Sequence, residues 1–147
     1  MVKNLKINFS NNIEIKKGII HILVKYLQKE LNFNISLLII NFVSTYLITE
    51  INIKYLNHHY STDIITFYYN GNHNILDGEL YISIDDAIYN AKKFGVSNSD
   101  EYYRLVIHGI LHLLGYDDQN KNAKLVMKRL ENKLLRGFIS YIKANKI

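Results

Sequence analysis

The segment HGILHLLGYDD, residues 108–118, constrains the fold more than any other part of the sequence. His108 and His112 are four residues apart, so on an α-helix they share one face, with Cβ atoms about 5–6 Å apart. Gly115 stands where this helix would have to end, because glycine adopts positive φ at little cost. The turn would bring the Asp118 carboxylate back to the two imidazoles. The spacing therefore predicts a helix, a glycine turn and a metal site formed by His108, His112 and Asp118.

The ligand set of this predicted site indicates zinc. Two histidines and one carboxylate leave a fourth position for water, which is the arrangement of a catalytic zinc site. Zinc lowers the pKa of such a water to roughly 7. The chain has no cysteine, so a metal must be held by histidine and carboxylate side chains. The alternative is a structural helix in which hydrogen bonds in the core satisfy both histidines, but the glycine and the acid at these offsets favour the metal.

Composition limits the class of protein. The 147 residues, 48% hydrophobic and 21% charged, suit one soluble globular domain spanning 1–147. No apolar run is long enough for a membrane span, and the N-terminus lacks the features of a signal peptide, so a cytoplasmic location is expected and no membrane partner is. The net charge of +5 weakly favours an anionic partner. The abundance of Lys, Asn, Ile and Tyr is typical of AT-rich codon usage, which weakens the charge argument further.

Hydrophobic periodicity predicts an α+β fold, with a single mixed sheet packed against helices and the metal site on a late helix and the following turn. Ser44 is the expected N-cap of one helix, and Ser97 or Ser99 that of the helix carrying the histidines. The expected strands are residues 5–9, 35–44, 62–69 and 79–84. The expected helices are residues 15–31, 45–56, 85–94, a segment from the serine cap to 114, and 120–146.

The residue after His108 argues against a peptidase. Zincin peptidases place a glutamate directly after the first histidine, where it acts as general base. The corresponding residue here is Gly109. The spacing therefore predicts a metallohydrolase without the base that this class of peptidase requires.

The same segment resembles the signature H-G-x-L-H-L-x-G-Y-D-H of the YbeY family of bacterial rRNA maturation factors. The segments INIKYLNHHYSTDIITF (residues 51–67), DGELYIS (77–83) and VMKRLENKLL, with Met127 and Glu131, are also similar to the family's, in the same order. The resemblance covers roughly residues 35–135. It implies a zinc-dependent endonuclease for single-stranded RNA that acts in 16S rRNA 3′-end maturation and ribosome quality control. The implied partners are rRNA and the small ribosomal subunit, and no DNA is expected.

Two departures from the family pattern affect the site. The third metal ligand of the family is usually histidine and is Asp118 here, which is still an acceptable zinc ligand. The family's arginine, with a role in RNA contact or catalysis, aligns with Leu56. The candidates to replace it are His58 and His59, with Lys54 and Arg104 as further candidates. The alternatives are that the two histidines are exposed loop residues and that Arg104 forms a structural salt bridge.

The remaining site predictions concern supporting and RNA-binding residues. Thr62 and Asp63 suit turn chemistry, and Asp117 suits a bond to a ligand imidazole or to a helix end. His73 is expected to be structural. The candidates for RNA binding are Lys54, Lys128, Arg129, Lys133 and Arg136.

Three functional hypotheses follow from these residues. The first is a metal-dependent endoribonuclease. The second is a ribosome-assembly factor without catalysis, in which zinc only stabilises the turn and a basic surface binds rRNA. The missing arginine and the lack of an obvious general base favour this second hypothesis. The third, a peptidase, is disfavoured by Gly109.

Overall fold

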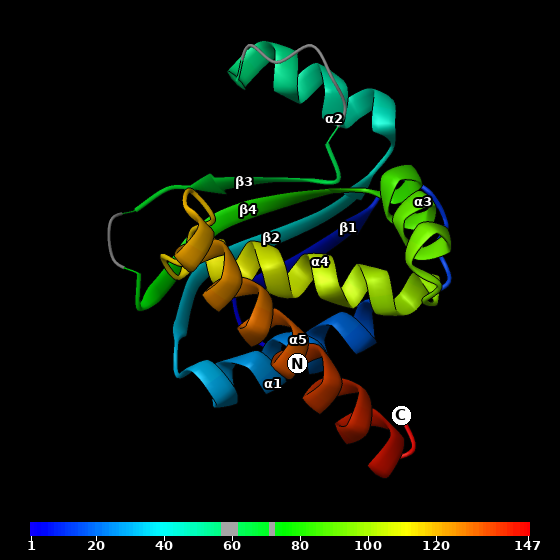
Figure 1. Ribbon diagram of the computed structural model, residues 1–147, viewed down its shortest axis with the longest axis vertical. Helices are drawn as coiled ribbons and strands as arrows, with labels where there is room; N and C mark the ends of the chain where they lie inside the picture. Colours follow the sequence, from blue (N-terminus) through cyan, green and yellow to red (C-terminus); the bar gives the residue numbers. More distant parts are fainter. Residues whose placement is uncertain (57–61, 71–72) are drawn as a thin grey trace.

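The computed structural model describes residues 1–56, 62–70 and 73–147, and its centre is a four-stranded sheet (Figure 1). The strand order is β1-β2-β4-β3. β1 pairs parallel with β2, β2 parallel with β4, and β3 antiparallel with β4, so the predicted mixed sheet is confirmed. The strands are β1 (Leu5–Phe9), β2 (Asn34–Val43), β3 (Ile64–Tyr68) and β4 (Ile75–Ser83).

Five α-helices are found in the described ranges, and together with the sheet they confirm the predicted α+β class. α1, α4 and α5 lie on one side of the sheet and α2 on the other (Figure 1). A short π-helical segment, η1 (Asn52–Leu56), continues α2. The α-helices are α1 (Lys17–Leu31), α2 (Thr45–Ile51), α3 (Ile84–Phe94), α4 (Asn98–Leu113) and α5 (Lys121–Ala144).

Local side-chain chemistry explains several of the observed boundaries. Ser44 caps α2 as predicted, and its Oγ accepts the Leu47 N–H at 3.2 Å. Ser97, not Ser99, caps α4 by accepting the Asp100 N–H at 3.0 Å. The strand predicted for residues 79–84 begins earlier, at Ile75, because its first residues pair with the start of β2. It also ends one residue earlier, because Ser83 caps α3.

α4 lies against the sheet more closely than most side chains would permit. Its apolar face shares one core cluster with the inner faces of β2 and β4. A Cβ atom on Gly109 would lie 2.8 Å from the Leu80 methyl groups and 2.9 Å from Cδ1 of Ile64. Gly109 therefore faces the sheet, which leaves the two histidines of α4 on another face of the helix.

The turn after α4 has the geometry that the glycine predicted. Gly115 has φ of +100°, in the region that disfavours residues with a Cβ. The Tyr116 N–H donates to the Leu111 carbonyl at 3.0 Å, and the Gly115 N–H donates to the His112 carbonyl at 3.0 Å. These bonds close the helix and turn the chain back toward α5.

No helix within the described ranges combines the length and the hydropathy that a bilayer crossing requires.

Candidate metal centre

The three predicted ligands converge at the carboxyl end of α4. His108, His112 and Asp118 each offer one ligand atom, and these atoms all lie within 4.8 Å of one another. The two Nε2 atoms are 3.1 Å apart, and Nε2 of His112 is 3.9 Å from Oδ2 of Asp118. Two nitrogens bound at about 2.0–2.1 Å to one tetrahedral ion stand about 3.3 Å apart, so the imidazole pair fits a shared ion.

The exposure of the three side chains fits a site with an open position. The side chains of His108, His112 and Asp118 are 21%, 25% and 47% exposed. Burial, followed by the charge of the neighbouring His108, lowers the pKa of His112. A neutral imidazole is the form that binds a metal. The donor set therefore fits a divalent ion that nitrogen and oxygen ligands hold and that solvent or a substrate can reach.

A buried glutamate on α5 orients the first of these ligands. The Nδ1 atom of His108 lies 2.8 Å from Oε2 of Glu131, whose side chain is 2% exposed. With its proton on Nδ1 donated to the carboxylate, His108 presents the Nε2 lone pair to the metal. The sequence comparison included Glu131 only as part of the family's closing helix and gave it no role.

Arg104 connects Glu131 to a second buried acid. Its Nη1 donates to Oε1 of Glu131 at 2.8 Å, and its Nε donates to Oε1 of Glu101 at 2.7 Å. Nη2 forms a further short contact with Glu101. Burial would lower the pKa of Arg104, but the bonds to the two carboxylates raise it above its ordinary value. Arg104 therefore forms the salt bridges named as the alternative to a catalytic role.

The charge on Glu131 is maintained by the same contacts. Burial alone would raise the pKa of this carboxyl group. The bonds from His108 and Arg104 outweigh that effect and hold the pKa below its usual value. Glu131 is thus an ionised acceptor for two donors from α4.

Asp63 is connected to these buried charges through Asn90. The Asn90 amide on α3 donates to Oδ2 of Asp63 at 3.1 Å and to Oε2 of Glu101 at 3.4 Å. The Asp63 carbonyl also accepts the Ser83 N–H at 2.9 Å. Thr62, next to it, is half-buried. Asp63 therefore joins the start of β3 to the cap of α3.

The other predicted supporting residue, Asp117, has a turn contact. Its Oδ1 accepts the Gln119 N–H at 3.2 Å, and its side chain is exposed, just before the Asn120 cap of α5. Within the described residues, Glu131 holds a ligand imidazole in the way predicted for Asp117. His58 and His59 lie outside the described residues.

His73 packs against the glycine turn. A Cβ atom on Gly115 would lie 3.3 Å from Nδ1 of His73. That ring stacks on Tyr68 with centroids 5.1 Å apart, and its Nδ1 is 2.9 Å from the Tyr68 hydroxyl. The turn that positions Asp118 is therefore tightly packed on its sheet side.

The metal centre opens into a larger groove between α4 and α5. A cavity of about 160 Å³ contains His108, Asp118 and Glu131 in its lining. A cavity of about 740 Å³ runs on from it toward α3, and the two share Arg104, Lys124 and Lys128. We call the two together the α4–α5 groove.

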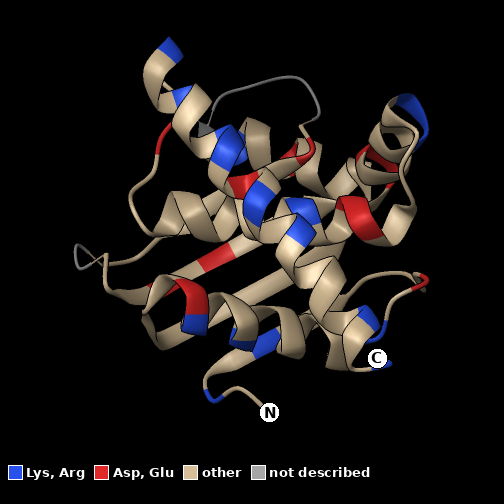
Figure 2. Cartoon of the chain, turned by 60° about the horizontal axis from the view of Figure 1, so that its bottom comes forward, with Lys and Arg blue, Asp and Glu red and all other residues tan. Residues whose placement is uncertain are grey.

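The predicted RNA-binding residues have different positions relative to this groove. Lys128 and Arg136 line it, as does Lys124, which the sequence analysis did not select. Figure 2 shows Lys and Arg positions recurring along the helix that leads to the C-terminus. Arg129 and Lys133 are exposed on α5 but are not among the lining residues. Lys54 is exposed on η1, with its Nζ 5.2 Å from the centroid of the Tyr55 ring.

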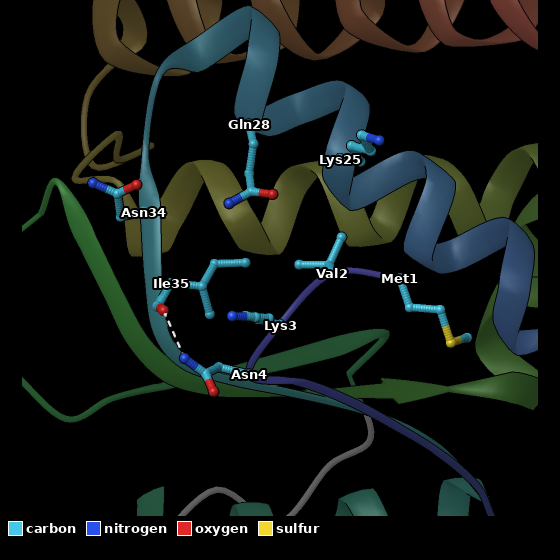
Figure 3. Close-up of a pocket in the computed structure, with 8 residues that line it drawn as sticks. All are labelled: Met1, Val2, Lys3, Asn4, Lys25, Gln28, Asn34 and Ile35. Atoms are coloured by element: carbon cyan, nitrogen blue, oxygen red, sulfur yellow. Dashed lines mark hydrogen bonds between the residues drawn. The ribbon is translucent and has the colours of Figure 1, made fainter.

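A separate cavity of about 430 Å³ lies between the N-terminal segment, α1 and the start of β2 (Figure 3). Its charged lining residues are Lys3 and Lys25, and Asn4 donates to the Ile35 carbonyl at 3.3 Å. Among the described residues that line it there is no histidine or carboxylate. The chemistry of a metal centre is thus found at the α4–α5 groove and not at this cavity.

Comparison with known proteins places the chain in a family. The family model described as Endoribonuclease YbeY matches residues 2–139. A protein named Endoribonuclease YbeY from Bacteroides thetaiotaomicron is 46% identical over 95 residues, which are 64% of this chain and 68% of that protein. A protein of the same name from Chlorobaculum parvum is 46% identical over 86 residues, or 58% and 60% of the two chains. The aligned segments thus span 60–68% of these relatives' own length.

A solved structure supports the fold. The solution structure of a Thermotoga maritima protein has a TM-score of 0.68 and 23% identity, and the match covers 96% of this chain and 93% of that one. The family match extends over nearly the whole chain and confirms the assignment that the signature at residues 108–118 predicted. The chain belongs to the endoribonuclease YbeY family.

Proposed function

We propose that this chain is a zinc-dependent endoribonuclease that cleaves single-stranded RNA. Its substrate would be precursor 16S rRNA on the small ribosomal subunit, in the cytoplasm, during 3′-end maturation and ribosome quality control. Residues 1–147 would act as one domain. One observation carries the proposal: the three ligand atoms converge within 4.8 Å at the end of a groove whose α5 wall carries basic side chains. The family assignment agrees with that chemistry.

The residues of the chain would divide the work between holding the metal and holding the strand. A bound zinc ion supplies Lewis-acid polarisation of a phosphate oxygen and a water of lowered pKa. His108, His112 and Asp118 would hold it, and Glu131 would keep the His108 proton on Nδ1. Lys124 and Lys128 line both parts of the groove. They would attract the phosphates that flank the scissile bond.

A second candidate is the assembly factor without catalysis. Leu56 stands where the family has arginine, and the guanidinium of Arg104 is engaged by two buried carboxylates. These observations leave the described residues without an uncommitted arginine beside the metal site that could stabilise the charge on a phosphate in transition. Under this hypothesis the protein would bind rRNA and zinc but would not cut.

A cleavage assay separates the two candidates. Purified protein is incubated with single-stranded RNA from the 3′ end of precursor 16S rRNA, with zinc, with a chelator, and with small ribosomal subunits added. The endoribonuclease proposal expects zinc-dependent cleavage that His112→Ala abolishes while much of the RNA affinity remains, because basic side chains supply the nonspecific binding. Tight binding with no cleavage under any of these conditions would establish the assembly factor instead.

A further inference from the structure

The part of the α4–α5 groove that leads away from the metal has two chemically different walls. The α5 wall carries Lys124, Lys128, Asn132 and Arg136 at steps of four residues. Four residues advance about 6 Å along a helix, so these side chains form one row about 18 Å long. The row begins at the metal cavity, because Lys124 and Lys128 line both cavities.

The other wall, from α3 and α4, is apolar and acidic. Phe94, at the end of α3, is 61% exposed, and Val96 beside it is 44% exposed. Asp100 on the first turn of α4 also lines this part. Leu135 and Ile139 add apolar lining from α5 itself, beside the basic row. Such a wall suits a flat apolar ring whose edge carries N–H donors.

We propose that this part of the groove is a subsite for one nucleotide flanking the cleaved bond, with its base against Phe94 and its phosphates along the row on α5. The inference rests on the proposed function for the identity of the strand. A polynucleotide has an anionic backbone on one side and a base on the other, which matches the two walls. The volume of about 740 Å³ lies in the range of about 300–1,000 Å³ typical of ligand pockets. Asp100 would accept a hydrogen bond from the base edge.

The binding test uses a single-stranded RNA of about 12 nucleotides in the presence of chelator, on the His112→Ala background, so that cleavage cannot interfere. Phe94→Ala should weaken RNA affinity roughly 10-fold, the effect of losing one base–aromatic stack. The matched control is Tyr89→Ala, because Tyr89 is 67% exposed on the same helix and does not line the groove. Equal affinities for the Phe94 and Tyr89 variants would overturn the subsite.

The row on α5 is tested through the salt dependence of binding. Replacing Lys124 and Arg136 by glutamine should reduce the slope of log affinity against log salt by about 1.4, since each phosphate contact contributes about 0.7 for single strands. The control, with glutamine at Lys143 and Lys146, removes the same charge from exposed positions outside the groove. Equal changes of slope in the two double variants would show that the groove does not guide the phosphates.

Abasic substitutions identify the nucleotide. One base of the RNA is removed at a time, and affinity is measured with the protein that has Phe94 and with Phe94→Ala. At a single position the loss of affinity should be large when Phe94 is present and should disappear in Phe94→Ala, which is the coupling that a double-mutant cycle detects. If no position couples to Phe94 and the groove instead binds an amphipathic peptide, the nucleotide subsite is refuted and the groove is a site for a protein partner. The subsite and the nuclease proposal can fail separately. If one base couples to Phe94 but the parent protein does not cleave RNA, the subsite stands and the nuclease proposal fails. If Phe94→Ala cleaves RNA with an unchanged KM, the nuclease proposal stands and the subsite is refuted.

Discussion

Glu131→Gln should damage both the stability of the protein and its affinity for metal, although Glu131 is not a ligand. The two carboxylate oxygens accept from different donors, Oε1 from Arg104 and Oε2 from Nδ1 of His108. A glutamine of the same shape has one oxygen and one NH₂ group, so it must direct N–H groups at one of these donors. If it faces His108, the imidazole must move its proton to Nε2, the atom needed for the metal.

The size of the effect follows from burial. The Glu131 side chain is 2% exposed and that of Arg104 18%, so the pair is screened weakly. Removing one partner of a buried pair costs about 3–5 kcal/mol, which lowers the midpoint of thermal unfolding by roughly 10–15 °C in a chain of this size. Losing a carboxylate that orients a ligand imidazole costs about 10- to 100-fold in metal affinity.

Two measurements and one control test the reasoning. Unfolding is followed in chelator, so that the metal does not contribute, and zinc affinity is measured separately by competition with a dye. Glu101→Gln is the control, because Glu101 is also buried and pairs with Arg104, whereas among the described residues the carboxylate bonded to His108 is that of Glu131. It should lose stability by a similar amount and zinc affinity by much less. Equal zinc affinities for wild type and Glu131→Gln would refute the role of Glu131 in orienting His108.

Three further predictions concern the glycines and the third ligand. Gly115→Ala should cost about 1 kcal/mol or more of folding free energy and weaken zinc binding. The control Gly95→Ala, which is also at positive φ but has open space around it, should lower stability alone. Denaturation and zinc titration of both variants check this. Asp118→His should retain stoichiometric zinc by elemental analysis and retain or increase cleavage, while Asp118→Ala should lose most of the metal. Gly109→Glu should destabilise the fold by more than about 3 kcal/mol and should not create peptidase activity, because the new side chain would point at Leu80 in the core. Thermal unfolding measures the loss of stability, and a casein assay tests for peptidase activity.

The convergence of the three candidate ligands was predictable from the sequence because their geometry is local. A spacing of four residues fixes the relative directions of two side chains on a helix, and a glycine at a helix end indicates where the chain turns. His108, His112 and Asp118 fall within 11 residues, so the prediction required no knowledge of the tertiary structure. The caps at Ser44 and Ser97 were predictable for the same reason.

Glu131 could not be placed in the site by such reasoning, because it is 23 residues from His108 on another helix. A signal for its burial was nonetheless present. The buried residues of α5 are Met127, Glu131, Leu134 and Phe138, so the glutamate occupies the apolar stripe of an amphipathic helix. A carboxylate at such a position requires partners, since burial of an unpaired charge is unfavourable. The sequence therefore indicated that Glu131 is paired, but not with which residues.

The early start of β4 has a tertiary cause. Asp77 and Gly78 have low preference for strands, and the sequence analysis began the strand after them. In the fold they pair with Leu37 and Leu38 of β2. A Cβ atom on Gly78 would lie 2.6 Å from the Phe67 carbonyl, so the position requires glycine for close packing. Here the packing of a neighbouring strand outweighs local propensity.

The positions of Gly109 and Arg104 together explain why this helix suits a nuclease site better than a peptidase site. Gly109 is directed at the sheet, so the residue that supplies the base in zincin peptidases has no access to the ligands. Arg104 lies one turn before His108, on the side that faces α5 and the groove, and its charge is balanced by Glu101 and Glu131. The fixed charges beside the metal centre are thus largely paired with one another. Under the proposed function, the row on α5 attracts the polyanion, and substitutions there should alter RNA binding without disturbing the three candidate ligands.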